Sequence, residues 1–236
     1  MARFDAVKFQ DFFKYYDEQN PKHRAAVQEL GQKIQQLDAS LLSDEANWVR
    51  VYRTKYPADA EPSGVSAEIK LNVPFFQQLD NYTMPYRTCN SSSCAMLLAY
   101  EKPGSIKNDD EYLRTVLSIG DTTVHEVQTA ALAKYGLKTE FRTDLGFADL
   151  DRSLAAKHPV VISIYHRGTL QNPTGGHVII VVGKDKNGDY LCHDPYGSLH
   201  DNYQGAVTNG KFVTYSRHIL LHRWIAGDRG WGRVVL

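Results

Sequence analysis

The sequence has little cysteine, no excess of either charge and no long apolar run. Its 236 residues include three cysteines, and 27 Lys and Arg residues balance 27 Asp and Glu residues. Three cysteines are too few for a disulfide framework, and no pair has the C-x-x-C spacing that is typical of structural zinc. At least one thiol is therefore free.

The balanced charge and the short apolar runs argue against two classes of partner. A formal net charge of zero gives the chain no overall attraction to nucleic acid or to an anionic membrane. The longest apolar runs, such as residues 178–182, are far shorter than the roughly 20 residues that span a bilayer. We expect a monomer with no nucleic-acid partner and no membrane insertion.

The first residues, MARFDAVKFQDFF, lack the features of a secretory signal. They contain acidic residues and have no continuous apolar core followed by a small-residue cleavage site. We therefore expect the protein to be made and folded in the cytoplasm.

The apolar pattern divides the chain into a helical segment, a linker and a larger body. Residues 1–55 carry several apolar sets with helical spacing. Residues 56–69 contain two prolines, a glycine and small polar residues, and show neither the helical nor the strand period. We predict a small helical module over 1–55, a linker over 56–69 and one domain over 70–236.

Within residues 70–236, helical segments come first and strands follow. We expect helices over 91–101, 109–118, 124–135 and 149–156, strands in IKLNVPFF, PVVISIYH, HVIIVVG and DYLCHDPY, and a helix and a final strand in the tail. The run HVIIVVG is apolar at almost every position, which is typical of a strand buried on both faces. Helices that precede an antiparallel sheet predict the α+β class.

The stretch PYRTCNSSSCAMLLAY contains two of the three cysteines at the start of an expected helix. Cys89 lies just before the helix, where Asn90 or Ser91 is expected to act as the N-cap and the helix dipole favours a thiolate. Cys94 lies one and a half turns further along among apolar residues, so we expect it to face the core. Cys89 is the candidate nucleophile, and a small core residue is the alternative interpretation.

A histidine and an aspartate follow on two neighbouring strands. His177 lies between a glycine pair and the strand HVIIVVG, and Asp194 ends the partner strand. In a two-residue hairpin the numbers of paired residues sum to an odd number, so these two side chains share a face. A turn at Lys186-Asn187, or a bulged loop, brings Asp194 diagonal to His177, whereas a turn at Asn187-Gly188 places it too far away.

A thiol at a helix start, with a distant histidine and aspartate on one hairpin face, supplies a nucleophile, a base and a group that orients the base. Such chemistry also needs a donor to the oxyanion. Gln78 in VPFFQQLDN is the candidate, and Gln77 is the alternative because strand alternation leaves open which amide points inward.

Other polar and aromatic residues carry weaker signals. Cys192-His193-Asp194 is not expected to bind a metal, because strand alternation turns His193 to the opposite face. No H-E-x-x-H or phosphate-binding glycine loop is present, and we expect no cofactor. His125 is expected on a polar helix face or in the core. The candidates for lining a cleft are Tyr82, Tyr86, His166, Tyr196 and Trp231.

The segments VPFFQQLDN, TCNSSSCAM, GGHVIIVVG and HDPYG resemble papain-like cysteine peptidases of the bacteriocin-processing, double-glycine leader type. The resemblance covers roughly residues 70–200 and implies a papain-like fold that hydrolyses amide bonds. It implies Gln78 as oxyanion donor and Cys89 as nucleophile, with His177 as base and Asp194 as the group that orients it. Asn90-Ser91 follows the cysteine here, where many members have Gly-Pro.

Residues 1–55 resemble, through a diffuse motif, the short helical modules that precede catalytic domains in phage cell-wall lysins. This resemblance implies an endolysin-type peptidoglycan hydrolase, an endopeptidase or amidase, which a separate pore would release to the bacterial cell wall. The alternatives are an intracellular cysteine protease or acyltransferase acting on a protein or peptide, and a papain-like binding module without catalysis.

Overall fold

The structure is a computed structural model, and it describes residues 68–170, 172–226 and 229–236. The chain divides into two units, and all of the described residues belong to the C-terminal unit, residues 65–236. The predicted helical module over 1–55 and nearly all of the predicted linker lie outside the described residues. The predicted domain organisation therefore stays a prediction.

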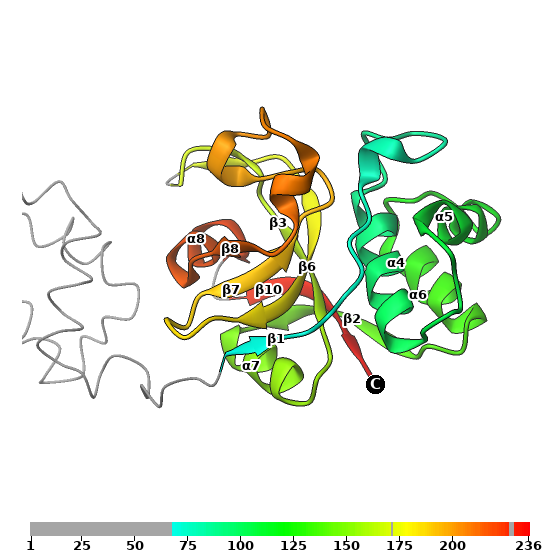
Figure 1. Cartoon of the computed structure of the whole chain (residues 1–236), viewed down its shortest axis with the longest axis horizontal. Helices are drawn as coiled ribbons and strands as arrows, with labels where there is room; N and C mark the ends of the chain where they lie inside the picture. The colour runs from blue at the N-terminus through cyan, green and yellow to red at the C-terminus, as the bar shows by residue number, and fades with distance from the viewer. Residues whose placement is uncertain (1–67, 171, 227–228) are drawn as a thin grey trace, which may run out of the picture. The chain divides into compact units, whose positions relative to one another are not determined.

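Helices form one side of the described body, to the right in Figure 1. They are α4 (Cys89–Glu101), α5 (Asp109–Leu117) and α6 (His125–Lys134). Asn108 caps α5, because its side chain accepts a hydrogen bond from the backbone N–H of Glu111. Gly136 follows α6 with a φ of +74°, a left-handed conformation that favours glycine and ends a helix. Most of α4 is buried, as expected of a central helix.

An antiparallel sheet forms the other side (Figure 1). Its strand order is β2-β10-β3-β6-β7-β8, with β1 paired to β6 and β9 paired to β10. The strands are β1 (Ile69–Lys70), β2 (Thr139–Leu145), β3 (Val160–Ile164), β6 (His177–Lys184), β7 (Tyr190–His193), β8 (Val213–Tyr215), β9 (Ile225–Ala226) and β10 (Arg229–Val235). The predicted α+β class is confirmed.

Shorter elements complete the body. They are the two-stranded sheet of β4 (Arg167–Gly168) and β5 (Pro173–Thr174), the helices α7 (Phe147–Ala155) and α8 (Arg217–Arg223), and the 3₁₀ helices η2 (Gln78–Asp80), η3 (Leu199–Asp201) and η4 (Val207–Gly210).

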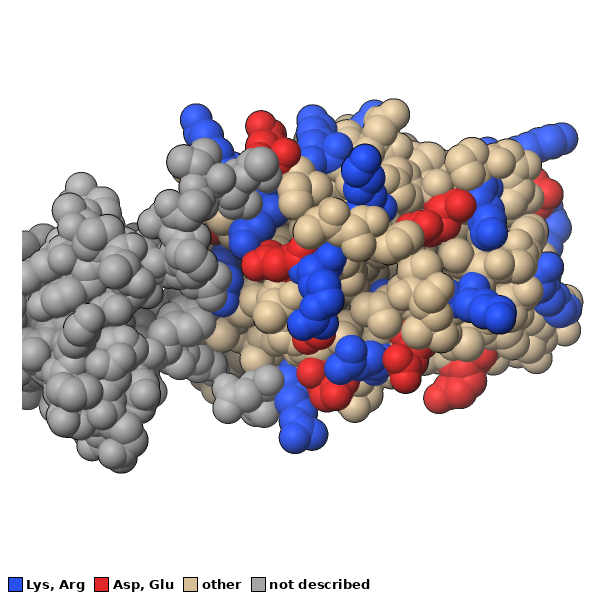
Figure 2. All heavy atoms as spheres, turned by 90° about the horizontal axis from the view of Figure 1, so that it is seen from below, with Lys and Arg blue, Asp and Glu red and all other residues tan. Residues whose placement is uncertain are grey.

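None of the helices in the described part of the chain is long and apolar enough to cross a membrane. On the face shown in Figure 2, basic and acidic side chains of the described residues are interspersed.

The core lies between α4 and the sheet. Cys94 is fully buried on α4, as predicted, and the residues from Ile179 to Val182 on β6 are also fully buried. The hydroxyl of Ser93 donates a hydrogen bond of 3.0 Å to the carbonyl of Val178, which joins the helix directly to the strand. β6 is buried along nearly its whole length, so the prediction of a strand buried on both faces is confirmed.

The connection between β6 and β7 differs from the predicted two-residue turn. Lys184 pairs with Tyr190, which leaves residues 185–189 as a five-residue loop. The register then shifts between Val181 and Gly183, and Val181 pairs with Cys192. This shift is a β-bulge, in which one strand carries an extra residue.

The bulge decides which way Asp194 faces. Without it, the register next to the loop would pair Asp194 with Ile180, on the face opposite to His177. With it, Ile180 pairs with His193, so one further step places Asp194 opposite Ile179. Ile179 shares a face with His177, because the two are separated by two positions on one strand. The bulge thus supplies the diagonal neighbour relation for which a turn at residues 186–187, or a bulged loop, was expected.

Candidate active site

Cys89 is the first residue of α4, and Thr88 is its N-cap. The predicted caps Asn90 and Ser91 are wrong, because both lie inside the helix and the helix begins two residues earlier than expected. The amide of Asn81 donates a hydrogen bond of 2.8 Å to the Thr88 hydroxyl, which helps to fix the start of the helix. The thiol therefore lies in the first turn, where the helix dipole stabilises negative charge.

The environment of Cys89 favours the thiolate. Burial by itself raises the pKa of this thiol, but the interaction with the His177 ring, together with the backbone groups of Val178 and Asn90, outweighs burial and lowers the pKa below its ordinary value. Cys89 remains partly exposed. A thiolate that is stabilised and still accessible is the reactive form of cysteine.

His177 is the first residue of β6 and lies 2.7 Å from Asp194, measured from Nε2 to Oδ1. Burial by itself disfavours the imidazolium, but the charge and hydrogen bond of Asp194 and the contact with Cys89 raise the pKa of His177 to about 10. Because Nε2 is engaged by Asp194, Nδ1 is the ring nitrogen left for the thiol. The arrangement therefore favours an imidazolium beside a thiolate.

Asp194 is fully buried, and hydrogen bonds hold both of its carboxylate oxygens. Oδ2 accepts from the hydroxyls of Tyr203 at 3.1 Å and Tyr215 at 2.9 Å, and Oδ1 accepts from the backbone N–H of Tyr196 at 3.0 Å in addition to His177. Burial, followed by the nearby Asp194 charge, raises the pKa of both tyrosine hydroxyls, so they remain donors. A buried carboxylate needs such partners to stay charged.

Sequence reasoning missed Tyr203 and Tyr215. Tyr203 lies in the loop after η3 with a φ of +59°, a left-handed conformation that is uncommon for an aromatic residue. Tyr215 ends β8, next to β7. Neither the spacing nor the type of these residues indicates contact with Asp194, because a loop conformation and a strand pairing bring them there.

Of the two candidate oxyanion donors, Gln78 is buried and Gln77 is half-buried. The Gln78 side-chain amide donates a hydrogen bond of 2.8 Å to the carbonyl of Pro85, which leaves its second N–H free to donate. The backbone N–H of Gln78 donates to the carbonyl of Pro195 at 2.9 Å, which ties this segment to the residue after Asp194. Among the described residues, no hydrogen bond joins Gln78 to Cys89, so the role of Gln78 stays a prediction.

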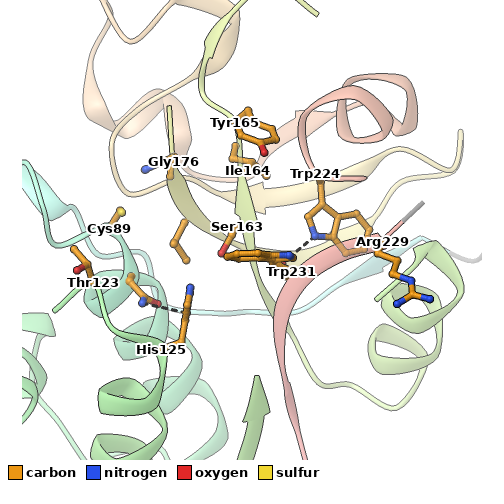
Figure 3. A pocket seen from close by; sticks show the side chains of 13 residues that line it. Cys89, Thr123, His125, Ser163, Ile164, Tyr165, Gly176, Trp224, Arg229 and Trp231 are labelled. Carbon is orange, nitrogen blue, oxygen red and sulfur yellow. Dashed lines mark hydrogen bonds between the residues drawn. The ribbon is translucent and has the colours of Figure 1, made fainter. Parts of the chain in front are cut away.

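A pocket of about 400 Å³ adjoins Cys89 and His177 (Figure 3). Trp231 lines it, as expected, whereas Tyr82 and Tyr86 lie on the surface outside it. The lining residues are Cys89, Asn90, Thr123, His125, Ser163, Ile164, Tyr165, Gly176, His177, Val178, Trp224, Arg229 and Trp231. The pocket therefore leads away from the candidate nucleophile along the boundary between the helices and the sheet.

The other two predicted cleft residues pack on the candidate base instead. The ring centroids of His166 and Tyr196 lie 5.3 Å and 6.0 Å from that of His177. Burial, with a smaller effect of the His177 charge, lowers the pKa of His166 to about 4, so this second histidine is neutral. Among the described residues, no group of three or more His, Cys, Asp and Glu side chains is arranged to hold a metal ion.

Comparisons with known proteins identify the fold and the family. Residues 70–223, about two thirds of the chain, match the model of the Peptidase_C39 like family. A solved structure from Bacillus anthracis, described as that of a C39-like peptidase, has a TM-score of 0.51 and 18% sequence identity, over 72% of this chain and 97% of that one. A search of the curated proteins gives no match. The predicted papain-like fold is confirmed, and residues 1–55 lie outside the family match.

Proposed function

The chain belongs to the Peptidase_C39 like family, and we propose on this premise that it hydrolyses peptide or amide bonds with Cys89 as nucleophile, His177 as base and Asp194 as the group that orients the base. One observation carries the proposal. The His177 ring is hydrogen-bonded to buried Asp194 at 2.7 Å through Nε2, while the same ring lowers the pKa of the Cys89 thiol.

The proposed first step is attack of the Cys89 thiolate on the carbonyl carbon of the substrate. The carbonyl electron pair moves to oxygen, and the backbone N–H of Cys89 and the free amide N–H of Gln78 are proposed to stabilise the resulting oxyanion. The oxyanion then re-forms the carbonyl, the C–N bond breaks, and the imidazolium of His177 gives its proton to the leaving amine. The product of this step is a thioester on Cys89 and neutral His177.

The second half of the reaction releases the acyl group. Neutral His177 removes a proton from water, the hydroxide attacks the thioester carbonyl, and the C–S bond breaks. A carboxylic acid leaves, and the thiolate and imidazolium are restored. In both halves Asp194 stabilises the charged ring and fixes its orientation, as in other triads of this kind.

For the substrate, we propose a peptide or amide bond of bacterial peptidoglycan, cleaved by an endolysin-type endopeptidase or amidase. This part rests on the resemblance of residues 1–55 to lysin modules, and these residues lie outside the described part of the chain. Action as a monomer that reaches the wall through a separate pore also stays a prediction.

The test is to incubate the full chain with defined peptidoglycan and, separately, with unfolded protein, and to identify the fragments by mass spectrometry. We expect new peptide or amide ends from peptidoglycan, and none with Cys89→Ala. Cys192→Ala is the matched control, because Cys192 is fully buried on β7 and should be dispensable for turnover. Cleavage of unfolded protein alone would replace the cell-wall substrate with an intracellular protease role, and full activity of Cys89→Ala would refute the mechanism.

A further inference from the structure

The pocket beside Cys89 has walls from two parts of the fold (Figure 3). Thr123 and His125, at the start of α6, line the side of the helices. Ser163 of β3 and Trp231 of β10, which pair across the two strands, line the side of the sheet. In Figure 3 the Trp231 ring lies between His125 and the Trp224 ring, and Cys89 lies at the opposite end. Cys89 and Trp231 line the same pocket, so a substrate whose scissile bond lies at Cys89 can place a neighbouring group against Trp231.

Aromatic contacts fix the shape of this pocket. The His125 ring stacks on Phe141, with centroids 3.7 Å apart and planes at 11°, and Trp231 meets Phe141 edge-on at 6.2 Å and 90°. Phe141 thus supports both rings from the adjoining strand β2. Fixed walls suit a specificity site, because little conformational freedom is lost when a ligand binds.

Among the described residues that line the pocket, Trp231 has the largest solvent-exposed apolar side chain. The residue is 53% exposed, while its backbone carbonyl accepts a hydrogen bond of 3.0 Å from the indole N–H of Trp224. Gly230 permits this packing, because a Cβ at that position would overlap the Trp224 ring. The backbone of Trp231 is held by this hydrogen bond and its ring contacts Phe141, while about half of the residue stays exposed. Covering this exposed surface with an apolar group is favourable.

The charges around the pocket disfavour a cationic ligand. Among the described residues that line it, none is Asp or Glu, and Arg229 adds a positive charge. Burial, followed by the nearby Arg233 charge, lowers the pKa of His125, so that ring is neutral at neutral pH. A Lys or Arg side chain of a substrate would find no counter-charge here, apart from the Cys89 thiolate itself.

We propose that this pocket binds a bulky, uncharged side chain, aromatic or branched aliphatic, of a residue next to the scissile bond, and that Trp231 determines this specificity. The inference rests on the proposed chemistry of Cys89, His177 and Asp194, since it assigns the substrate class of the same site. It is independent of the proposed cell-wall substrate, because peptidoglycan stem peptides consist mainly of alanine, glutamate and a diamino acid and offer no such side chain. The volume of about 400 Å³ lies within the range of pockets that enclose small organic groups, and a glycine or alanine side chain would leave most of it empty.

The experiment compares N-benzyl, N-methyl and N-(4-aminobutyl) chloroacetamide as reagents for the full chain. In each case the thiolate displaces chloride and forms a thioether, and peptide mapping by mass spectrometry measures the rate at Cys89. Each rate is divided by the rate of the same reagent with glutathione, which removes differences in intrinsic reactivity. We expect the N-benzyl reagent to exceed the N-methyl reagent by about tenfold, the effect of burying one aromatic ring, and the cationic reagent to gain nothing.

Two variants test the assignment to this pocket. Trp231→Ala should reduce the benzyl-to-methyl ratio about tenfold, and Gly176→Leu should also reduce it, because a Cβ at Gly176 meets no atom and the added side chain fills the rim. Tyr82→Ala is the matched control, since Tyr82 is 51% exposed and lies outside the pocket, and it should keep the ratio.

Equal benzyl and methyl rates at Cys89, or a ratio that Trp231→Ala leaves unchanged, would overturn the specificity proposal. Failure of the proposed function is a separate result. It would appear as methyl-reagent labelling of Cys89 that follows the pH dependence of an ordinary free thiol.

Discussion

The Nε2 atom of His177 lies 2.7 Å from Oδ1 of Asp194, although the two residues stand at the ends of strands whose pairing is interrupted by a bulge between Val181 and Gly183. The bulge turns the Asp194 side chain to the face of His177. The contact depends on this one irregularity in the sheet, and both the charge of His177 and the pKa of Cys89 depend on the contact.

We predict a pH window for hydrolysis set by Cys89 and His177. Turnover needs a thiolate and an imidazolium, so it should rise with pH through the lowered pKa of Cys89 and fall as pH passes through about 10, the raised pKa of His177. In His177→Ala the thiol loses the interaction that lowers its pKa while burial still raises it. The pH at which iodoacetamide labels Cys89 should therefore move upward, and an unchanged midpoint would contradict the ion pair.

Replacing Tyr203 with Phe should weaken the orientation of His177. The variant removes one hydrogen bond of 3.1 Å to the buried Asp194 carboxylate, which is expected to lower the free energy of unfolding by about 1–3 kcal/mol. Because Asp194 acts through His177 and not on the substrate, kcat should fall with little change in KM. Tyr112→Phe removes a buried hydroxyl that bonds to Gln128, and it should destabilise the fold without lowering kcat. Equal kcat values for the two variants would argue against a positioning role for Tyr203.

Asp109 is expected to make stability depend on pH in the acidic range. Burial is the main cause that raises the pKa of this carboxyl from 3.8 to about 6, against the hydrogen bond of 2.7 Å from Ser92. The folded state then binds the proton more tightly than the unfolded state, so stability falls as pH rises from 3.8 to about 6, by on the order of 3 kcal/mol. Asp109→Asn should remove this fall, measured by urea unfolding at pH 4 and pH 7.

Ser92→Ala is a second test of Asp109. It removes the hydrogen bond that stabilises the ionised carboxyl, so the pKa of Asp109 should rise further. The pH range over which stability falls should then extend to higher pH. A stability profile that is the same in the wild type and in both variants would show that Asp109 does not carry the effect.

Arg233 is predicted to stabilise the fold and the pocket wall together. It is almost fully buried, and it donates hydrogen bonds to the hydroxyls of Thr129 and Thr139 and to the carbonyl of His125. Arg233→Met leaves these acceptors without their donor and should lower the free energy of unfolding by about 2–4 kcal/mol. Arg142→Met, which removes an exposed ion pair with Asp144, should cost less than about 1 kcal/mol. Comparable losses in the two variants, measured by chemical unfolding, would contradict this assignment.

Much of the fold could be predicted because its signals are local. The helices α5 and α6 follow from apolar spacing, and the strand β6 follows from an unbroken apolar run. The strand β2 was missed. Its sequence TEFRTDL is mostly polar, and it is a strand because it lies at the edge of the sheet and pairs with β10, a partner from the far end of the chain.

The sequence by itself determined the α+β class, the presence of a cysteine at the start of a helix, and the histidine and aspartate at strand ends. These depend on short-range periodicity and on the residues that begin and end elements. The tertiary structure alone decided the bulge in β6, the hydroxyls of Tyr203 and Tyr215 on Asp194, and the pocket between His125 and Trp231. Each of these depends on where distant segments pack. Because β6 is apolar on both faces, its pattern does not give the register, and Gly183 beside the shift marks only a position that favours a bulge.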